Sequence, residues 1–150
     1  MNILALDLGT HLGWAHSCGL SGTWDLSVKR DESSGMRLIR LRAKLREIFE
    51  GEGIDLLFFE AVRFAGPKMG GSLVVMGELQ GVIKLWCEAK KIPYKGFSST
   101  EIKKFATGKG NSGKPIMKKA ALKKWGQKVL PMDDNEIDAK WILEYGLTTL

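Results

Sequence analysis

The chain has 150 residues, of which 44% are hydrophobic and 27% charged, a composition that is typical of a folded protein and excludes a disordered or fibrous one. We expect one domain over residues 1–150, and the widely separated Cys18 and Cys87 argue against both a disulfide framework and a structural zinc site. The net charge of +6 is unevenly placed, because residues 102–132 hold nine lysines and no acid.

The N-terminal region predicts three strands joined by tight turns. Its apolar stretches are residues 2–8, 14–17 and 22–28. Gly9, Thr10 and Gly13 fall in the first expected turn. No basic flank of a signal peptide precedes the first stretch, and no run approaches the ~20 apolar residues of a membrane span, so we expect a cytoplasmic protein without membrane contact.

Helices alternate with strands in the middle of the chain. Residues 35–50 carry apolar side chains at helical spacing. Residues 54–59 form a continuous apolar run that ends at Glu60, as in a strand covered on both faces, and we therefore expect the centre of the sheet here. Residues 64–71 contain three glycines and a proline and are expected to form a loop.

Residues 73–89 are long and mostly apolar, which predicts a buried helix. Gly77 and Gly81 lie one turn apart and would permit close packing. The segment is more apolar than one sheet face requires, so it is a candidate interface with a second copy of the chain. The alternative is that the helix is simply central core. A further strand is expected at residues 92–97.

The strongly basic region contains two predicted helices and a loop. Ser98 and Glu101 have the spacing of a capping box that begins a helix. Residues 107–113 form a basic, glycine-rich loop, and residues 114–128 predict a lysine-rich helix before Pro131. The lysines suit a polyanionic partner, although lysines that only solvate exposed helices would give the same composition.

A final helix is expected over residues 134–145, because Asp133 and Glu136 repeat the capping-box spacing. Three hairpin strands therefore come first, and two strands alternating with helices follow. This order predicts the α/β ribonuclease H-like fold, in which helices flank a five-stranded mixed sheet.

Two acids stand at the ends of apolar strands. An acid at the end of such a run must be solvated at the sheet edge or neutralised by a partner. If the strands that end at Asp7 and Glu60 are adjacent and parallel, both carboxylates emerge at the same carboxyl edge, where open α/β sheets place their sites. A solvated strand end would explain either acid alone but explains the pair less well.

The last predicted helix adds two more acids on one face. The positive helix N-terminus accounts for Asp134, but Asp138 lies beyond the first turn among apolar residues and is better explained by a counter-ion. Carboxylates without nearby His or Cys select a hard cation, so we expect Mg²⁺ or Mn²⁺. Two such ions would suit phosphodiester hydrolysis, and the lysines would hold the phosphate backbone.

Five motifs spread over the chain resemble those of the RuvC-type Holliday junction resolvases, in the order that this family has them, as in a compact, phage-like member. The motifs are DLGTHLGWA at residues 7–15, FFEAV at 58–62, LQG at 79–81, IKKFATGKGNSGK at 102–114 and NEIDA at 135–139. The resemblance implies a homodimer that binds four-way DNA junctions and makes paired, symmetric nicks, with two Mg²⁺ or Mn²⁺ ions in each active site.

The same resemblance implies the site residues. Asp7, Glu60 and Asp138 would be metal ligands, and the fourth would be Asp134, preferred for its charge, or Asn135 through its amide oxygen. Lys103 and Lys114 would contact phosphate near the scissile bond. Phe64 would stack at the opened junction or simply cover the sheet edge. The remaining expected DNA contacts are Arg63, Lys104, Lys109 and Lys118.

Three other interpretations remain open at this stage. A D-x-G-T turn also occurs in ATP-binding proteins of the actin and sugar-kinase group, but that group needs a second such element, which is missing here. A nucleic-acid-binding protein without cleavage would gain nothing from burying carboxylates beside phosphate. A related nuclease could act on other branched DNA or on RNA.

Overall fold

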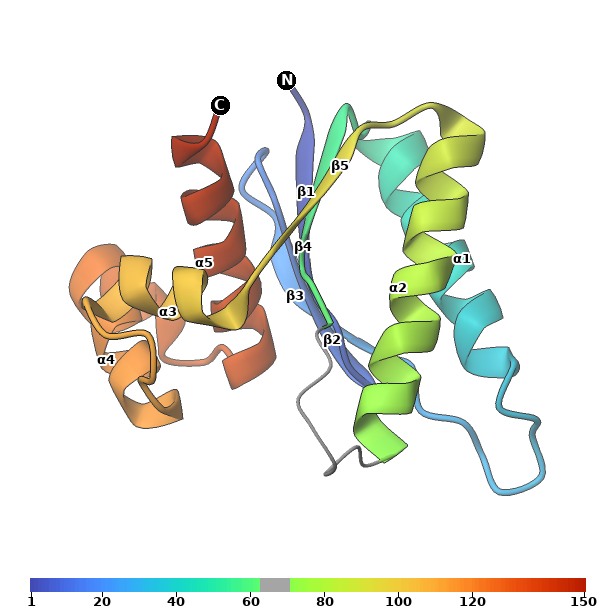
Figure 1. The fold of residues 1–150 in the computed structure, drawn as a ribbon, viewed down its shortest axis with the longest axis horizontal. Coiled ribbons are helices and arrows are strands. Elements are labelled where there is room, and N and C mark those ends of the chain that lie inside the picture. Colours follow the sequence, from blue (N-terminus) through green and yellow to red (C-terminus); the bar gives the residue numbers. More distant parts are fainter. Residues whose placement is uncertain (63–70) are drawn as a thin grey trace.

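A five-stranded mixed sheet lies between two layers of helices (Figure 1). The computed structural model describes residues 1–62 and 71–150, with side chains described at 1–62 and 73–150. The expected loop at 64–71 and the DNA contacts expected of Arg63 and Phe64 lie outside this part of the chain, apart from Gly71, which begins a helix.

The sheet has the strand order β3-β2-β1-β4-β5. Its central strand, β1 (Ile3–Asp7), pairs antiparallel with β2 (His11–His16) and parallel with β4 (Leu56–Glu60). The edge strands are β3 (Ser21–Asp25), antiparallel to β2, and β5 (Tyr94–Phe97), parallel to β4. This arrangement confirms the α/β ribonuclease H-like fold with three hairpin strands followed by two parallel ones.

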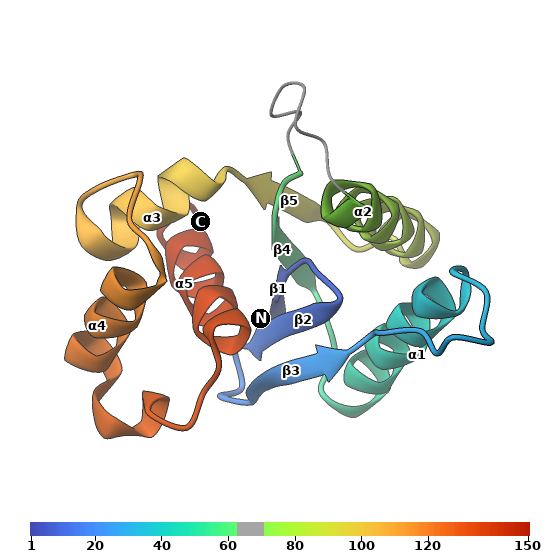
Figure 2. The ribbon, with the colours of Figure 1, turned by 90° about the horizontal axis from the view of Figure 1, so that it is seen from below.

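The helices divide between the two faces of the sheet. One face is covered by α1 (Met36–Gly51) and α2 (Gly71–Lys90). The other is covered by α5 (Asp134–Thr148), with α3 (Ser99–Thr107) and α4 (Lys114–Trp125) packed outside it (Figure 2). No helix among the described residues is long and apolar enough to cross a membrane.

Successive side chains along the strands point to opposite faces of the sheet, so each face has its own hydrophobic core. In β1, Leu4 and Leu6 pack toward α1 and α2, whereas Ile3 and Ala5 pack toward α5. Both sets are buried. The central strands are therefore apolar on both faces, which explains the continuous apolar run that ends at Glu60.

Glycines let α5 lie unusually close to the sheet. A Cβ atom on Gly13 would overlap the main-chain carbonyl of Asn135, and one on Gly146 would overlap the ring of Phe58. The expectation that Gly13 belongs to a turn is wrong, because it is paired with Asp7 inside β2. A glycine within a strand here marks a close approach of another backbone.

The lysine-rich helix is shorter than expected. It was expected over residues 114–128 but ends at Trp125, because Gly126 has φ +77°, a left-handed conformation that favours glycine. A 3₁₀ turn over Gly126–Val129 follows and buries Val129. The chain then turns back to begin α5.

Candidate active site

Strand alternation directs two carboxylates to the same face of the sheet. Ala5 pairs with Phe58 and Leu6 with Phe59, so continuing the register places Asp7 beside Glu60. Asp7 shares its side of β1 with Ala5, and Glu60 shares its side of β4 with Phe58. Both acids therefore lie at the carboxyl edge of the sheet, on the side covered by α5, as the two strand ends predicted.

Side chains of β3 hold the N-terminus of α5 at this edge. The Asp133 carboxylate caps the helix by accepting a hydrogen bond from the Glu136 amide at 2.8 Å, and it also accepts one from Thr23 Oγ1 at 2.8 Å. In a complete capping box, the Glu136 carboxylate would accept a hydrogen bond from the Asp133 amide. Here it accepts one from Ser21 Oγ instead, at 2.7 Å. Asp133 and Glu136, which predicted the start of α5, thus also tie this helix to the sheet.

Asp138 faces the sheet from the second turn of α5. The pKa of its carboxyl is raised to about 7, chiefly by burial and then by the neighbouring charges of Glu60 and Asp134, against the opposing influence of Lys114 and Lys103. The residues on either side of it, Ile137 and Ala139, are buried in the core. Asp138 is therefore an acid in the desolvated environment that its apolar neighbours predicted.

Asp7 is the most desolvated acid of the cluster. Burial raises its pKa well above the usual range, and the charges of Asp138 and Glu60 raise it further, whereas Lys114 lowers it. Asp133, the cap of α5, also raises this pKa. The three expected ligands from β1, β4 and α5 thus lie close enough to oppose one another's ionisation.

Glu60 has two partners on α3. Burial raises its pKa, and this effect is opposed by the charge of Lys103 and by a hydrogen bond from the Ser99 side chain. Ser99 follows the Ser98 cap, whose side chain accepts from the Glu101 amide at 3.1 Å while the Glu101 carboxylate accepts from the Ser98 amide at 2.9 Å. This capping box, which the sequence predicted, fixes the start of α3 beside Glu60.

The two candidates for the fourth ligand have different surroundings. Asp134 is partly exposed and lies 3.8 Å from Lys114, measured from Oδ2 to Nζ, and its charge acts on Asp138. Asn135 has its main-chain carbonyl pressed against Gly13. The charge of Asp134 thus acts on the cluster, and the choice of Asp134 over Asn135 as fourth ligand stays a prediction.

The chemistry of this edge fits a divalent metal ion. Asp7, Glu60 and Asp138 are all carboxylates, and their mutual repulsion and burial would be offset by a cation. Among residues 1–62 and 71–150, no three Asp, Glu, His or Cys side chains converge into a finished metal-binding group. The candidate donors stand on three elements, β1, β4 and α5.

The expected basic residues fall into two groups. Lys103 and Lys114 act directly on the carboxylates, as described above. The other three are Lys104 on α3, Lys109 in the turn between α3 and α4, and Lys118 on α4. That turn is held by Thr107, whose hydroxyl group bonds the Ser112 hydroxyl and the Lys109 carbonyl at 2.5 and 3.1 Å. Lys109 is thus exposed on a well-anchored turn.

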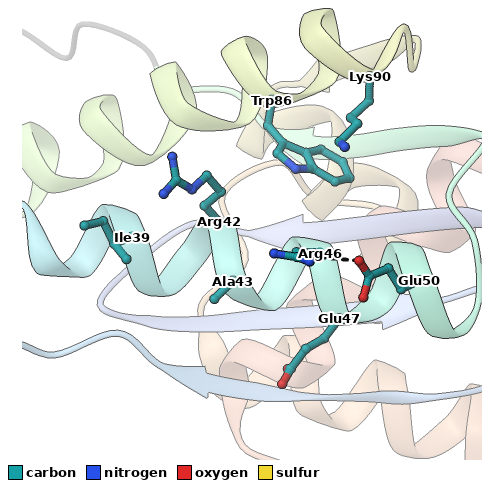
Figure 3. A pocket seen from close by; sticks show the side chains of 8 residues that line it. All are labelled: Ile39, Arg42, Ala43, Arg46, Glu47, Glu50, Trp86 and Lys90. Carbon is teal, nitrogen blue, oxygen red and sulfur yellow. Dashed lines mark hydrogen bonds and ion pairs between the residues drawn. The ribbon is translucent and has the colours of Figure 1, made fainter.

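A separate hollow of about 620 Å³ lies between α1 and α2 (Figure 3). Trp86 and Ile39 contribute its apolar part. Of its charged residues, Arg46 and Glu50 form an ion pair at 2.9 Å, and Glu47 pairs with Lys44 outside the hollow. None of the cluster carboxylates lines it, so it is not part of the candidate active site.

Three residues near the site were not predicted from the sequence. Asp133 was assigned only to a cap, Gly13 to a turn, and Ser99 had no assigned role. A glycine that interrupts a strand pattern is a usable signal for close backbone approach. Nothing in the sequence distinguishes Ser99 from an ordinary first-turn serine.

Two curated relatives are similar to this chain in sequence, and no family model matches the chain. The crossover junction endodeoxyribonuclease RuvC of Gloeobacter violaceus is 28% identical over 103 residues, which cover 69% of this chain and 58% of the relative. The enzyme of the same name from Rhodopirellula baltica is 25% identical over 114 residues, covering 76% and 64%. The chain thus spans about three fifths of the length of these relatives.

Solved structures of RuvC and of a Holliday junction resolvase share the fold of this chain. Thermus thermophilus RuvC superposes with a TM-score of 0.74 at 17% identity, covering 99% of this chain and 96% of that protein. T. thermophilus RuvC in complex with a Holliday junction substrate gives 0.75 at 18% identity, covering 97% and 92%. The yeast mitochondrial Holliday junction resolvase gives 0.63 at 12%, covering 95% and 76%. Together, these similarities confirm the resemblance to RuvC-type resolvases.

Proposed function

We propose that this chain is a metal-dependent endonuclease that resolves four-way DNA junctions by paired nicks. The observation that carries the proposal is the meeting of Asp7, Glu60 and Asp138 from three elements at one sheet edge, with Lys103 and Lys114 beside them. The curated relatives are named crossover junction endodeoxyribonucleases, and one matching structure is a complex with a Holliday junction. These names support the choice of substrate.

Asp7, Glu60, Asp138 and Asp134 are the residues that would hold the metal ions. Two Mg²⁺ or Mn²⁺ ions held there would activate the attacking water and stabilise the leaving 3′ oxygen. Ser99 orients Glu60 by donating to its carboxylate, and the anchored N-terminus of α5 fixes the approach of Asp138 to the sheet. The chain's contribution is to hold concentrated negative charge in a partly dry site until a cation neutralises it.

The lysines complete the site electrostatically. Lys103 and Lys114 lower the pKa values of the cluster acids and so help to keep them ionised. The same two cations are available to a phosphate group beside the cluster. Lys104, Lys109 and Lys118 extend the positive charge along α3 and α4, where they would contact the DNA backbone.

The outer face of α2 supports a homodimer. Leu79 and Ile83 are buried in the core, but Val74 and Leu85 are 54% and 71% exposed. Among the residues that the structure describes, a Cβ atom on Gly77 or Gly81 would meet nothing within 4 Å, so packing within that part of the chain does not require these glycines. An isologous pairing through this face would give two active sites related by a two-fold axis, as paired cuts in a four-way junction require.

The proposal is tested by incubating the protein with a synthetic four-way junction, a duplex of matched sequence and a flap, each with Mg²⁺ or Mn²⁺. We expect symmetric nicks in the junction and none in the duplex. A junction that is bound but never cut would identify a binding protein. Equal cutting of flap and junction would indicate a nuclease for other branched DNA, and preference for RNA versions would indicate an RNA nuclease.

A further inference from the structure

A second hollow opens directly beside Glu60. It has a volume of about 550 Å³ and lies between the end of β4, the first turns of α2 and the start of α3. One wall is apolar and consists of Ala61, Val62, Leu73 and Met76. The start of α3 contributes the hydroxyl-bearing residues Ser99 and Thr100 to the lining. A mostly apolar hollow with a few convergent polar groups has the character of a small-ligand subsite.

Hydrogen bonds hold the walls of this hollow in place. The Val62 amide donates to Gln80 Oε1 on α2 at 2.8 Å, and the Ala61 amide donates to the Phe97 carbonyl at 2.8 Å. The polar wall begins at the Ser98 capping box described above. Ala61 and Val62, which follow β4, are thereby tied to β5 and to α2 respectively.

The lining indicates what this subsite can take. The described lining residues include the Glu60 carboxylate and no lysine or arginine, so they offer no cationic partner to an anionic group. Apolar side chains offer a surface for a flat, neutral group, and hydroxyl groups offer hydrogen bonds to a polar edge. A nucleobase combines these two properties, and enzymes that act on nucleic acids take up unstacked bases between such walls.

We infer that this hollow receives the nucleobase adjacent to the scissile phosphate, and that Met76 and Thr100 determine which base is preferred there. The inference rests on the proposed function, because the position of the scissile phosphate follows from the carboxylate cluster at Glu60. Met76 forms the surface against which the base packs. Thr100, which is exposed at the start of α3, contacts the polar edge of the base.

The inference is tested by combining variants of the protein with variants of the DNA, as in a double-mutant cycle. Four-way junctions are made with each of the four bases, or with an abasic site, next to the cleaved bond, and cleavage and binding are measured separately. We expect the abasic site to slow cleavage by the unmodified protein about tenfold, the scale of one lost base-stacking contact. Met76→Trp, which fills the hollow, should be slow on every junction and insensitive to the abasic site.

Thr100→Val keeps the shape of the polar wall but removes its hydroxyl group. We expect this variant to show an altered order of preference among the four bases. Thr148→Val on the last turn of α5 and Ile39→Trp on α1 are matched controls at exposed or partly exposed positions away from the hollow, and they should keep the original order. Junction binding and thermal unfolding report on folding of each variant.

The outcomes separate the inference from the proposed function. If the unmodified protein cuts no junction, the proposed function fails and the inference fails with it. If the unmodified protein cuts junctions but Met76→Trp remains sensitive to the abasic site and Thr100→Val keeps the original base preference, the inference alone is overturned. Non-additive effects of Met76→Trp and the abasic site, with unchanged controls, support it.

Discussion

The main-chain carbonyl of Asn135 occupies the space in which a Cβ atom on Gly13 would lie. Gly13 is paired with Asp7 across β1 and β2, and Asn135 precedes Asp138 by one helical turn. The distance between the strand acid and the helix acid is therefore set by the absence of a side chain at position 13. This contact leads to the first prediction.

Gly13→Ala should destabilise the protein by about 1–3 kcal/mol, as expected for an overpacked contact against main-chain atoms. It should also lower metal-dependent cleavage, because α5 must move away from Asp7, although no candidate ligand is removed. Thermal unfolding and junction cleavage would measure both effects. Gly51→Ala, at the end of α1 where a Cβ atom meets nothing, is the control. Full activity in Gly13→Ala would show that the α5 position is not critical.

Asp7→Asn, Glu60→Gln and Asp138→Asn should each abolish cleavage and leave junction binding nearly intact. Each change removes a negative charge that would bind metal, while the lysines of residues 102–132 are unaltered. Junction binding would fall only if the acids contacted DNA directly, so removing their charge should leave the affinity equal or higher. Cleavage assays and gel-shift titrations measure the two properties. The control is Asp31→Asn at an exposed position. Wild-type cleavage by Glu60→Gln would remove that residue from the site.

The metal-free protein should lose stability as the pH rises from 3.8 toward about 7, the usual and the native pKa of Asp138. The native state holds this proton to a higher pH than the unfolded chain does, so deprotonation lowers the free energy of unfolding. Asp138→Asn should therefore be more stable than the unmodified protein at pH 8, by up to about 4 kcal/mol, and not at pH 3. Denaturant unfolding with a chelator measures the difference.

Mg²⁺ should reverse this effect in the unmodified protein. A bound cation stabilises the ionised carboxylates, so the melting temperature at pH 8 should rise with Mg²⁺ concentration in the unmodified protein and much less in Asp138→Asn. The same melting temperature in both proteins, with and without Mg²⁺, would contradict a metal-binding role for Asp138.

Lys103→Ala and Lys114→Ala should reduce cleavage and shift its acidic limb to higher pH. Lys103 lowers the pKa values of Glu60 and Asp138, and Lys114 lowers those of Asp7 and Asp138, so their loss makes the acids harder to ionise. A pH–rate profile measures the shift, and Lys29→Ala at an exposed position is the control. The affinity of the unmodified protein for the junction should also fall steeply with salt. A salt-independent affinity would exclude the backbone-contact model.

Gly77→Leu or Gly81→Leu should weaken dimerisation and uncouple the two nicks, while metal binding at each single site survives. Because both positions are open in the chain, the larger side chain should not disturb folding of the protomer. Analytical ultracentrifugation and a cruciform plasmid, which distinguishes paired from single nicks, measure the effects. A strict monomer of the unmodified protein, both free and on a junction, would disprove the dimer.

The sequence by itself determined the sheet and the two strand acids. Apolar runs that end in Asp7 and Glu60 predicted adjacent parallel strands, and strand alternation is a local property, so the shared edge followed. Asp138 was recognisable because an acid among buried helix residues needs a nearby counter-charge. Helix starts at Ser98 and Asp133 were also predictable, because capping depends on side chains only three residues apart.

Only the tertiary structure decided which groups those local elements meet. Glu136 bonds Ser21 rather than its own cap, Ser99 bonds Glu60, and Gly13 receives the backbone of Asn135. Each contact joins residues far apart in the chain, and its formation depends on how α3 and α5 pack on the sheet. The open face at Gly77 and Gly81 is equally a tertiary result, because a sequence pattern does not distinguish glycines that pack inside the chain from glycines that face outward.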